Sequence, residues 1–487
     1  MIKIIISSFI AIALLINSCV ILYWRDTAYD PAGADLLCYL LILPIAVTAA
    51  VLAPYLIYRY LKYRKEKQQE KALQAAAFEK QQAQQLIDSS KAPAMQSSEF
   101  SVHIYAAAAW HSFGENEAII EQYKQFKSPE LDTSLLNPYG LPVLSLRIQD
   151  LDDLLQDAED DETLHMPMRE QRISHLINHQ IEQHAAVLAD VAEHLKDSAM
   201  FYDSEIAYQY KMHPAWMGNI DADGEFEEEP ADHAAKPVHR LNLLCIHLLL
   251  PEEMIHSWNN ALTEQMQQTL AEQFSIVPAQ IYIEQHFISQ HSAYAEWLKI
   301  LERISQQEHA FSLVINADSE IDQALLDEKF WQSEQYIAAE YVSSWCIANV
   351  QIEMKALQPC KTLKMTLNEA SIQDYLQAHQ LNHHVQFQQD EPCVLILDDA
   401  SNARTAKKLQ QKFTDSVIEP QHFLYGQPYV GHTQKLSAIF SFMLGTFFPE
   451  DIHGLVYSAE QENIYALFQG WQEEAVPQVL QEEFLNQ

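Results

Sequence analysis

A histidine that precedes a C-terminal apolar run is the residue of this sequence best placed for acid–base chemistry. His432 lies between Gly431 and Thr433, and the apolar spacing of residues 435–447 predicts a helix with one buried face. Thr433 suits the N-cap of that helix. An imidazole at this point can act as a general acid or base, or it can simply fill the turn. Whether the chain is an enzyme depends largely on which alternative holds.

The cysteines form no metal or disulfide pattern. None of the six belongs to a CxxC or other close pair: Cys19, Cys38, Cys245, Cys346, Cys360 and Cys393. The first two lie in long apolar segments, and the other four are interpreted as free core thiols in a reducing compartment. His175 and His179 have the i, i+4 spacing that can hold a metal on a helix, but no motif supplies a third ligand. The sequence therefore predicts no metal and no cofactor.

Two acidic segments follow predicted strands. Asp398–Asp399 comes after residues 393–397, and Asp318–Ser319 comes after residues 310–317. Sites in α/β proteins lie at such strand ends, but an acid there more often caps the next helix. We interpret Asp398–Asp399 as a cap, and the same two alternatives stand for Asp318–Ser319. The sequence has no GxGxxG, P-loop, GxSxG or HExxH motif.

The composition limits the kinds of partner. The chain has 487 residues, 48% of them hydrophobic, with a formal net charge of −37. Such a length can bury one or two large cores. So negative a charge argues against nucleic acid and against an anionic lipid surface as partners of a soluble domain. It favours a basic protein partner, or it serves only solubility.

The first 61 residues predict a membrane anchor. Residues 2–24 and 36–61 are almost continuously apolar, and about 20 residues suffice to span a bilayer. The alternatives are a cleaved signal peptide, or a single uncleaved anchor followed by a re-entrant segment. Positive residues concentrate after the second run, between Arg59 and Lys67. In a bacterial host this places both termini in the cytoplasm and the short linker in the periplasm.

Beyond the anchor we expect a stalk and a body. Residues 62–98 favour a helical stalk that ends in a serine-rich linker. In residues 99–487, predicted strands alternate with helices, so the fold class is α/β and mainly layered. We divide this domain into two halves, about 99–300 and 301–487.

The two ends of the body resemble the thiolase and β-ketoacyl-synthase family. The opening HIYAAAAWHSFGENEAIIEQYKQFKSP is similar to the synthase start, and VGHTQKLSAIFSFML is similar to the "GHT" helix near its end. Ser458, Glu462 and Asn463 fall in the family's final loop. The resemblance covers roughly residues 100–470 and implies a layered αβαβα fold in which His432 matches a catalytic histidine.

The departures from that family concern its chemistry. No cysteine lies in a glycine-rich elbow, the first catalytic histidine has no counterpart, and the closing glycine-rich loop is replaced by SAEQEN. If the chain is active, the resemblance leaves Cys346 and Cys245 as nucleophiles to work with His432. A thiol needs a base or a positive setting to become a nucleophile, and neither cysteine has one in sequence. We therefore expect a degenerate thiolase-like domain with no catalytic residue, which is not an enzyme.

The architecture also resembles the lipase-adaptor proteins of bacterial type VI secretion. That resemblance implies an inner-membrane adaptor with a cytoplasmic body, which binds a secreted lipase effector or a spike protein. Two alternatives remain: a membrane-tethered acyl-transfer enzyme of thiolase type, and a structural or sensing component of an envelope machine. No nucleic-acid partner is expected.

Overall fold

The computed structural model divides into two compact units, Met1–Met95 and Gln96–Gln487. The described residues of the first unit are helical and those of the second form the α/β body: 14, 16–18, 20–23, 25–27, 43, 97–157, 167–212, 238–258, 260–289, 293–330, 336–399, 402–426, 436–461 and 463–471. The expected spans and stalk lie mostly outside these residues. Within the described part, no helix is long and apolar enough to cross a bilayer.

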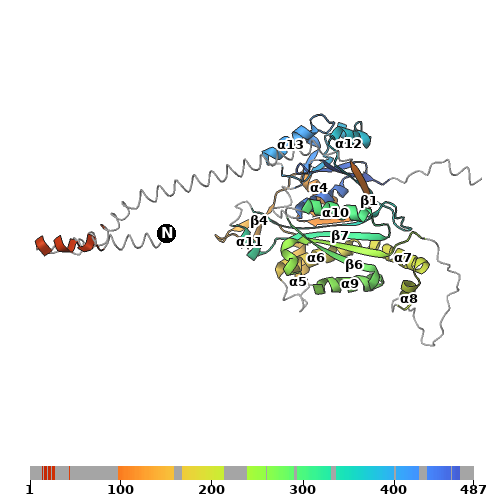
Figure 1. Cartoon of the computed structure of the whole chain (residues 1–487), viewed down its shortest axis with the longest axis horizontal. Coiled ribbons are helices and arrows are strands. Elements are labelled where there is room, and N and C mark those ends of the chain that lie inside the picture. Colours follow the sequence, from red (N-terminus) through yellow and green to blue (C-terminus); the bar gives the residue numbers. More distant parts are fainter. Residues whose placement is uncertain are drawn as a thin grey trace, which may run out of the picture. The chain divides into compact units, whose positions relative to one another are not determined.

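One large sheet organises the second unit (Figure 1). Its strands are β1 (Ser98–His111), β2 (Gly114–Glu115), β3 (Glu130–Leu136), β4 (Pro142–Leu146), β5 (Leu243–Pro251), β6 (Ile281–Ile288), β7 (Ala310–Ser319), β8 (Ala338–Asn349), β9 (Lys361–Leu367), β10 (Val394–Ile396), β11 (Phe423–Tyr425), β12 (Gly454–Tyr457) and β13 (Ile464–Gly470). The main path runs β11-β10-β12-β13-β9-β1-β8-β7-β5-β6. The β3–β4 hairpin joins through a short parallel contact with β8.

Helices of about two to five turns cover the sheet. They are α4 (Glu117–Lys124), α5 (Gln149–Asp157), α6 (Met168–Gln183), α7 (Ala185–Tyr202), α8 (Ser204–Met212), α9 (Asn260–Phe274), α10 (Ala293–Ser305), α11 (Gln323–Phe330), α12 (Ile372–Ala378), α13 (Ala403–Phe413) and α14 (Ser437–Met443). The last of these continues into a 3-10 turn, η8 (Leu444–Phe447). Another 3-10 turn, η3 (Glu252–His256), follows β5.

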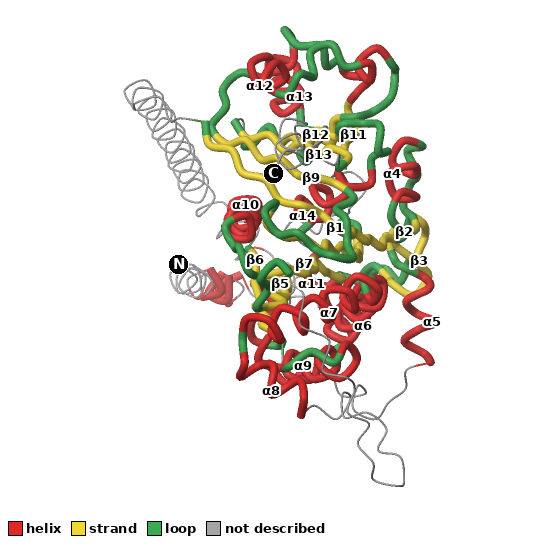
Figure 2. The backbone as a smooth tube through the Cα atoms, turned by 90° about the vertical axis from the view of Figure 1, so that its right-hand side faces the viewer, coloured by secondary structure: helices red, strands yellow, loops and turns green. Residues whose placement is uncertain are grey.

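The helices and the sheet form layers around three apolar clusters (Figure 2). The first cluster joins α10 and α14 to the sheet and includes Trp297, Trp345 and Phe442. The second packs α6, α7 and α9 against the other face of β5, β7 and β8. The third joins α12 and α13 to β10, β12 and β13. The central helices are therefore covered on both sides by strands, and outer helices cover those strands.

Local structure differs from the sequence prediction where a tertiary contact intervenes. The apolar spacing of residues 169–195 predicts one helix, but the structure has two, α6 and α7, because His184 sits at the junction and its Nε2 lies 2.7 Å from the Ser344 hydroxyl. Residues 252–274 also predict one helix, but this segment begins as η3 and the helix restarts at Asn260. Strand β9 was not predicted, because its sequence, KTLKMTL, carries two lysines and Lys361 is nevertheless buried.

Candidate functional site

The two predicted nucleophiles lie in the sheet, away from solvent. Cys346 is in the middle of β8 and fully buried, and burial raises the pKa of its thiol. Cys245 is on β5 and 3% exposed, and burial raises the pKa of its thiol to about 11. A thiol with a raised pKa is a weak nucleophile at neutral pH.

These two cysteines also face opposite sides of the sheet. Cys346 packs in the cluster beneath α6 and α7. Cys245 alternates with Leu244 and Ile246 of that cluster, so its side chain points to the α10 face, where Leu249 packs. One imidazole cannot serve both thiols. His432, the third member of the predicted set, lies outside the described residues, as does Glu462.

A third thiol, which the sequence analysis assigned to the core, is accessible. Cys360 is the only exposed cysteine of the described part of the chain. It lines a pocket of about 360 Å³ together with His384, His453, Glu450 and Asp451. Its Sγ donates to the carbonyl of Ile104 at 3.2 Å, and desolvation raises its pKa despite the neighbouring Lys361. No sequence spacing marks this grouping, because its residues come from separate loops.

The remaining predicted polar residues have structural partners. Asp398 does not cap the next helix, whose N-cap is Asn402. Its carboxylate instead accepts hydrogen bonds from Ser458 Oγ at 3.0 Å and from the Ala459 amide at 2.5 Å, so it closes the turn after β12. Our interpretation of Asp398 as a helix cap was therefore wrong, because its carboxylate accepts hydrogen bonds from the turn that begins 60 residues later.

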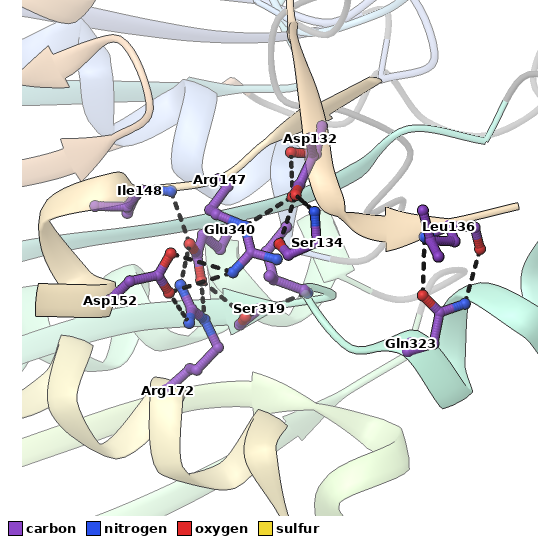
Figure 3. Close-up of polar contacts among 12 residues, drawn as sticks. Asp132, Ser134, Leu136, Arg147, Ile148, Asp152, Arg172, Ser319, Gln323 and Glu340 are labelled. Atoms are coloured by element: carbon purple, nitrogen blue, oxygen red, sulfur yellow. Dashed lines mark hydrogen bonds and ion pairs between the residues drawn. The ribbon is translucent and has the colours of Figure 1, made fainter. Parts of the chain in front are cut away.

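A buried ion pair lies at the base of the β3–β4 hairpin (Figure 3). Glu340 on β8 is fully buried, and the side chain of Arg172 on α6 is 2% exposed. Arg172 Nε donates to Glu340 Oε2 at 2.8 Å, and its Nη2 donates to Oε1 at 2.7 Å. The Ile148 amide and the Ser319 hydroxyl complete the carboxylate's partners at 2.7 and 3.0 Å.

The network continues outward into the hairpin. Asp152 accepts from Arg172 at 2.5 Å and from Arg147 at 3.2 Å. Arg147 also donates through Nε to Asp132 of β3 at 2.7 Å. Burial alone would raise the pKa of Asp132, but hydrogen bonds from Ser134 and Arg147 lower it to about 2. This chain of charges ties the hairpin to the body of the sheet.

A pocket opens beside this network. It holds about 480 Å³ and is lined by hairpin residues, by the start of α5 and by His111 at the end of β1. Burial, with the nearby Lys127, lowers the pKa of His111 to about 3, so its imidazole is neutral. Its Nδ1 accepts from the Phe113 amide at 3.3 Å, and among the described residues its Nε2 has no hydrogen-bond partner.

The outer side of the hairpin exposes large apolar side chains. We call this set the hairpin patch: Leu131, Leu136, Tyr139, Leu141 and Leu144. Leu131 and Leu144 are direct cross-strand partners and are 62% and 47% exposed, and Tyr139 at the tip is 77% exposed. The inner side packs Leu135 on Leu326 of α11. The patch is therefore carried on a hairpin that the body holds from behind.

Comparisons with known proteins give structural likeness only. No family model matches the sequence, and no curated protein matches it. The ishigamide ketosynthase/chain length factor matches 76% of this chain and 98% of its own, with 10% identity and a TM-score of 0.37. The oxazolomycin ketosynthase domain OzmH KS7 of Streptomyces albus JA3453 covers 77% and 76%, with 9% identity and a TM-score of 0.42. The peroxisomal 3-ketoacyl-CoA thiolase of Saccharomyces cerevisiae covers 47% and 83%, with 11% identity and a TM-score of 0.27.

These matches correct one prediction. We expected a chain that is not an enzyme, and this prediction is wrong as stated, because the solved structures similar to it include ketosynthases. At this identity no activity, substrate or catalytic residue passes from those proteins to this one. What the chain shares with them is a mixed α/β sheet fold.

Proposed function

We propose that this protein is a membrane-anchored adaptor of type VI secretion that binds a secreted lipase effector through the hairpin patch. The observation that carries the proposal is the exposure of Leu131, Leu144 and Tyr139 on a hairpin that is fixed from behind. Contiguous exposed apolar side chains of this kind are typical of protein-binding surfaces. An aromatic residue at the tip fits the composition of binding hot spots.

Charge around the hairpin patch supports a basic cargo surface. The pocket that includes Leu131 is lined by more acidic than basic residues: Glu130, Asp132, Asp150 and Asp152 against Lys127 and Arg147. The chain as a whole carries a formal charge of −37. Acidic residues around an apolar centre favour a partner with an apolar contact ringed by lysine and arginine, and they accelerate its association at low salt. The network from Arg172 to Asp132 keeps the hairpin preorganised, which reduces the entropy lost on binding.

Site-specific crosslinking in cells tests this function. A photoreactive amino acid replaces Tyr139 in the full chain, and the matched control replaces Tyr208 on α8, whose side chain is 64% exposed. We expect an adduct at position 139 that contains a lipase effector, and none at position 208. If the two positions give the same products, or if position 139 captures neither a lipase nor a spike protein, the proposal is wrong.

The second candidate is thiol-dependent acyl transfer at Cys360. The observation in its favour is the pocket that places this exposed thiol with two imidazoles and two carboxylates. In this candidate, Cys360 takes the place of Cys245 or Cys346 as the nucleophile that the sequence suggested for work with His432. The test is incubation with an acyl thioester followed by intact-mass measurement. An acyl adduct that is lost in C360S supports this function, and the absence of any adduct excludes it.

A further inference from the structure

Two histidines and a glutamate meet at the edge of the sheet, far in sequence from the hairpin. Parallel pairing of β5 and β6 places His247 directly opposite Glu284, and His286 follows two residues later on the same face of β6. That face is the one covered by α10, because Leu249 and Ile288 pack with Trp297 in one cluster. Strand β6 ends the sheet's main path, so Glu284 and His286 lie on an edge strand (Figure 2).

The three ligand atoms have the separations of one face of a coordination tetrahedron. His247 Nδ1 lies 3.2 Å from His286 Nε2. Glu284 Oε2 lies 3.5 Å from the first nitrogen and 3.6 Å from the second. Zinc bonds to nitrogen and to carboxylate oxygen are about 2.0–2.2 Å, which corresponds to tetrahedron edges of about 3.3–3.6 Å. A cation at the centre would therefore reach all three atoms with little movement.

The surroundings suit such a cation in two further ways. Arg303 of α10 donates to Glu284 Oε1 at 3.1 Å, and its Nη2 lies 2.8 Å from Oε2, so it holds the carboxylate in place. The side chains of Glu284 and His286 are 27% and 16% exposed, whereas His247 is 1% exposed. The cluster is therefore anchored on its inner side and open to solvent on its outer side, where a fourth ligand can enter.

We propose that His247, Glu284 and His286 bind one divalent transition cation of the zinc class, with the fourth position left to water or to a ligand atom. Two imidazole nitrogens and one carboxylate oxygen are a donor set that zinc takes in proteins with an open site. Among the described residues this is the one group of three such side chains whose ligand atoms converge. The sequence analysis missed it because the residues join only through strand pairing, with 36 residues between the first two.

Metal titration of the purified full chain, carrying no polyhistidine tag and stripped with a chelator, tests the site. We expect one Co²⁺ per chain with the intense visible absorption of tetrahedral cobalt, displaced by one Zn²⁺. H286Q and E284Q are expected to lower the affinity at least about 100-fold, since even a residue behind a ligand contributes about 10- to 100-fold.

The control is H383Q, because His383 is exposed and lies on another part of the chain. Its affinity and stoichiometry are expected to match those of the unmodified protein. Circular dichroism of each variant shows whether it is folded, and the two partly exposed positions avoid the packing cost of changing His247. Absence of the tetrahedral spectrum, or equal binding by E284Q, H286Q and H383Q, overturns the proposal and leaves a hydrogen-bonded cluster only.

Discussion

Arg172 and Glu340 form a bidentate ion pair, and both side chains are buried. The pair joins α6 to the middle of the sheet and is the inner end of the network that reaches the hairpin. Such pairs add little stability relative to apolar residues of the same size, but removal of one partner leaves a buried charge uncompensated. The pair therefore matters more for where the hairpin is held than for the total free energy of unfolding.

The first prediction concerns this pair. R172M is expected to lower the free energy of unfolding by about 3–5 kcal/mol, because Glu340 is left buried without its cationic partner. The double variant R172M/E340M is expected to recover most of that loss. Urea unfolding followed by circular dichroism measures both. If R172M and R172M/E340M lose the same free energy of unfolding, the unpaired Glu340 is not the cause of the loss in R172M.

The second prediction concerns the pH dependence of stability. Burial, together with the charge of Asp318, raises the pKa of Glu320 to about 7, and Tyr336 donates to its carboxylate at 2.5 Å. The other charged groups around it are Arg169 and Lys329. Because the folded pKa exceeds the unfolded value near 4.5, the folded state holds this proton more tightly. Its contribution is complete below about pH 4.5 and is lost as pH rises to about 7.

The variant E320Q is expected to remove that slope. Between pH 5 and pH 8, the free energy of unfolding of E320Q should change only by the contribution of the other titrating groups, which the two proteins share. The unmodified chain should lose up to about 3 kcal/mol more over this interval, from a shift of between two and three pKa units. Denaturant titrations at the two pH values check this. If the free energy of unfolding changes by the same amount between pH 5 and pH 8 in both proteins, the raised pKa of Glu320 is contradicted.

The third prediction concerns thiol reactivity. Cys360 is exposed, whereas Cys346 is buried on β8, which pairs with β1 on one side and β7 on the other. With an alkylating reagent at pH 8, Cys360 is expected to be labelled well before Cys346, which should react only when the protein unfolds. Peptide mapping by mass spectrometry separates the sites. The control is C360S, which should leave the labelling of Cys346 unchanged. Simultaneous labelling of both residues in the native protein would contradict the packing of β8.

The fourth prediction concerns how the hairpin is held. Gln323 of α11 accepts a hydrogen bond from the Leu136 amide at 2.9 Å and donates to the Leu136 carbonyl at 2.8 Å. Q323A removes both contacts, so amide exchange in β3 and β4 is expected to accelerate about five- to thirtyfold, which corresponds to about 1 kcal/mol for one typical hydrogen bond and about 2 kcal/mol for two. Hydrogen exchange with mass spectrometry measures this. The control is Q268A, on α9, which should leave the hairpin unchanged.

The sequence predicted elements well where local pattern decides them. Residues 293–305 predict a helix, and α10 has these bounds. Residues 343–352 predict a strand, and most of them belong to β8. The alternation of strands and helices also gave the correct α/β class. These successes depend on hydrophobic periodicity, which reports burial of one face and needs no knowledge of the partner.

The site could not be predicted in the same way, because its contacts join distant residues. The acidic composition of residues 151–162 predicts a solvated segment, yet Asp152 binds Arg172 twenty residues later. The Arg172–Glu340 pair is separated by 168 residues. The hairpin strand β3 has exposed leucines near both ends and a buried aspartate between them, a pattern that resembles neither a core strand nor a surface strand. Only the packed sheet shows which charges meet.

The most direct test of the adaptor proposal is the affinity of the full chain for a purified type VI lipase effector. The unmodified protein is compared with L131S/Y139S, which removes the centre and tip of the hairpin patch, and with Y208S as the control for an exposed apolar residue elsewhere. We expect L131S/Y139S to weaken binding at least about 30-fold, equivalent to about 2 kcal/mol or more, and Y208S to leave it unchanged. Equal affinity of all three proteins for the effector, or no binding by the unmodified chain, would contradict the account.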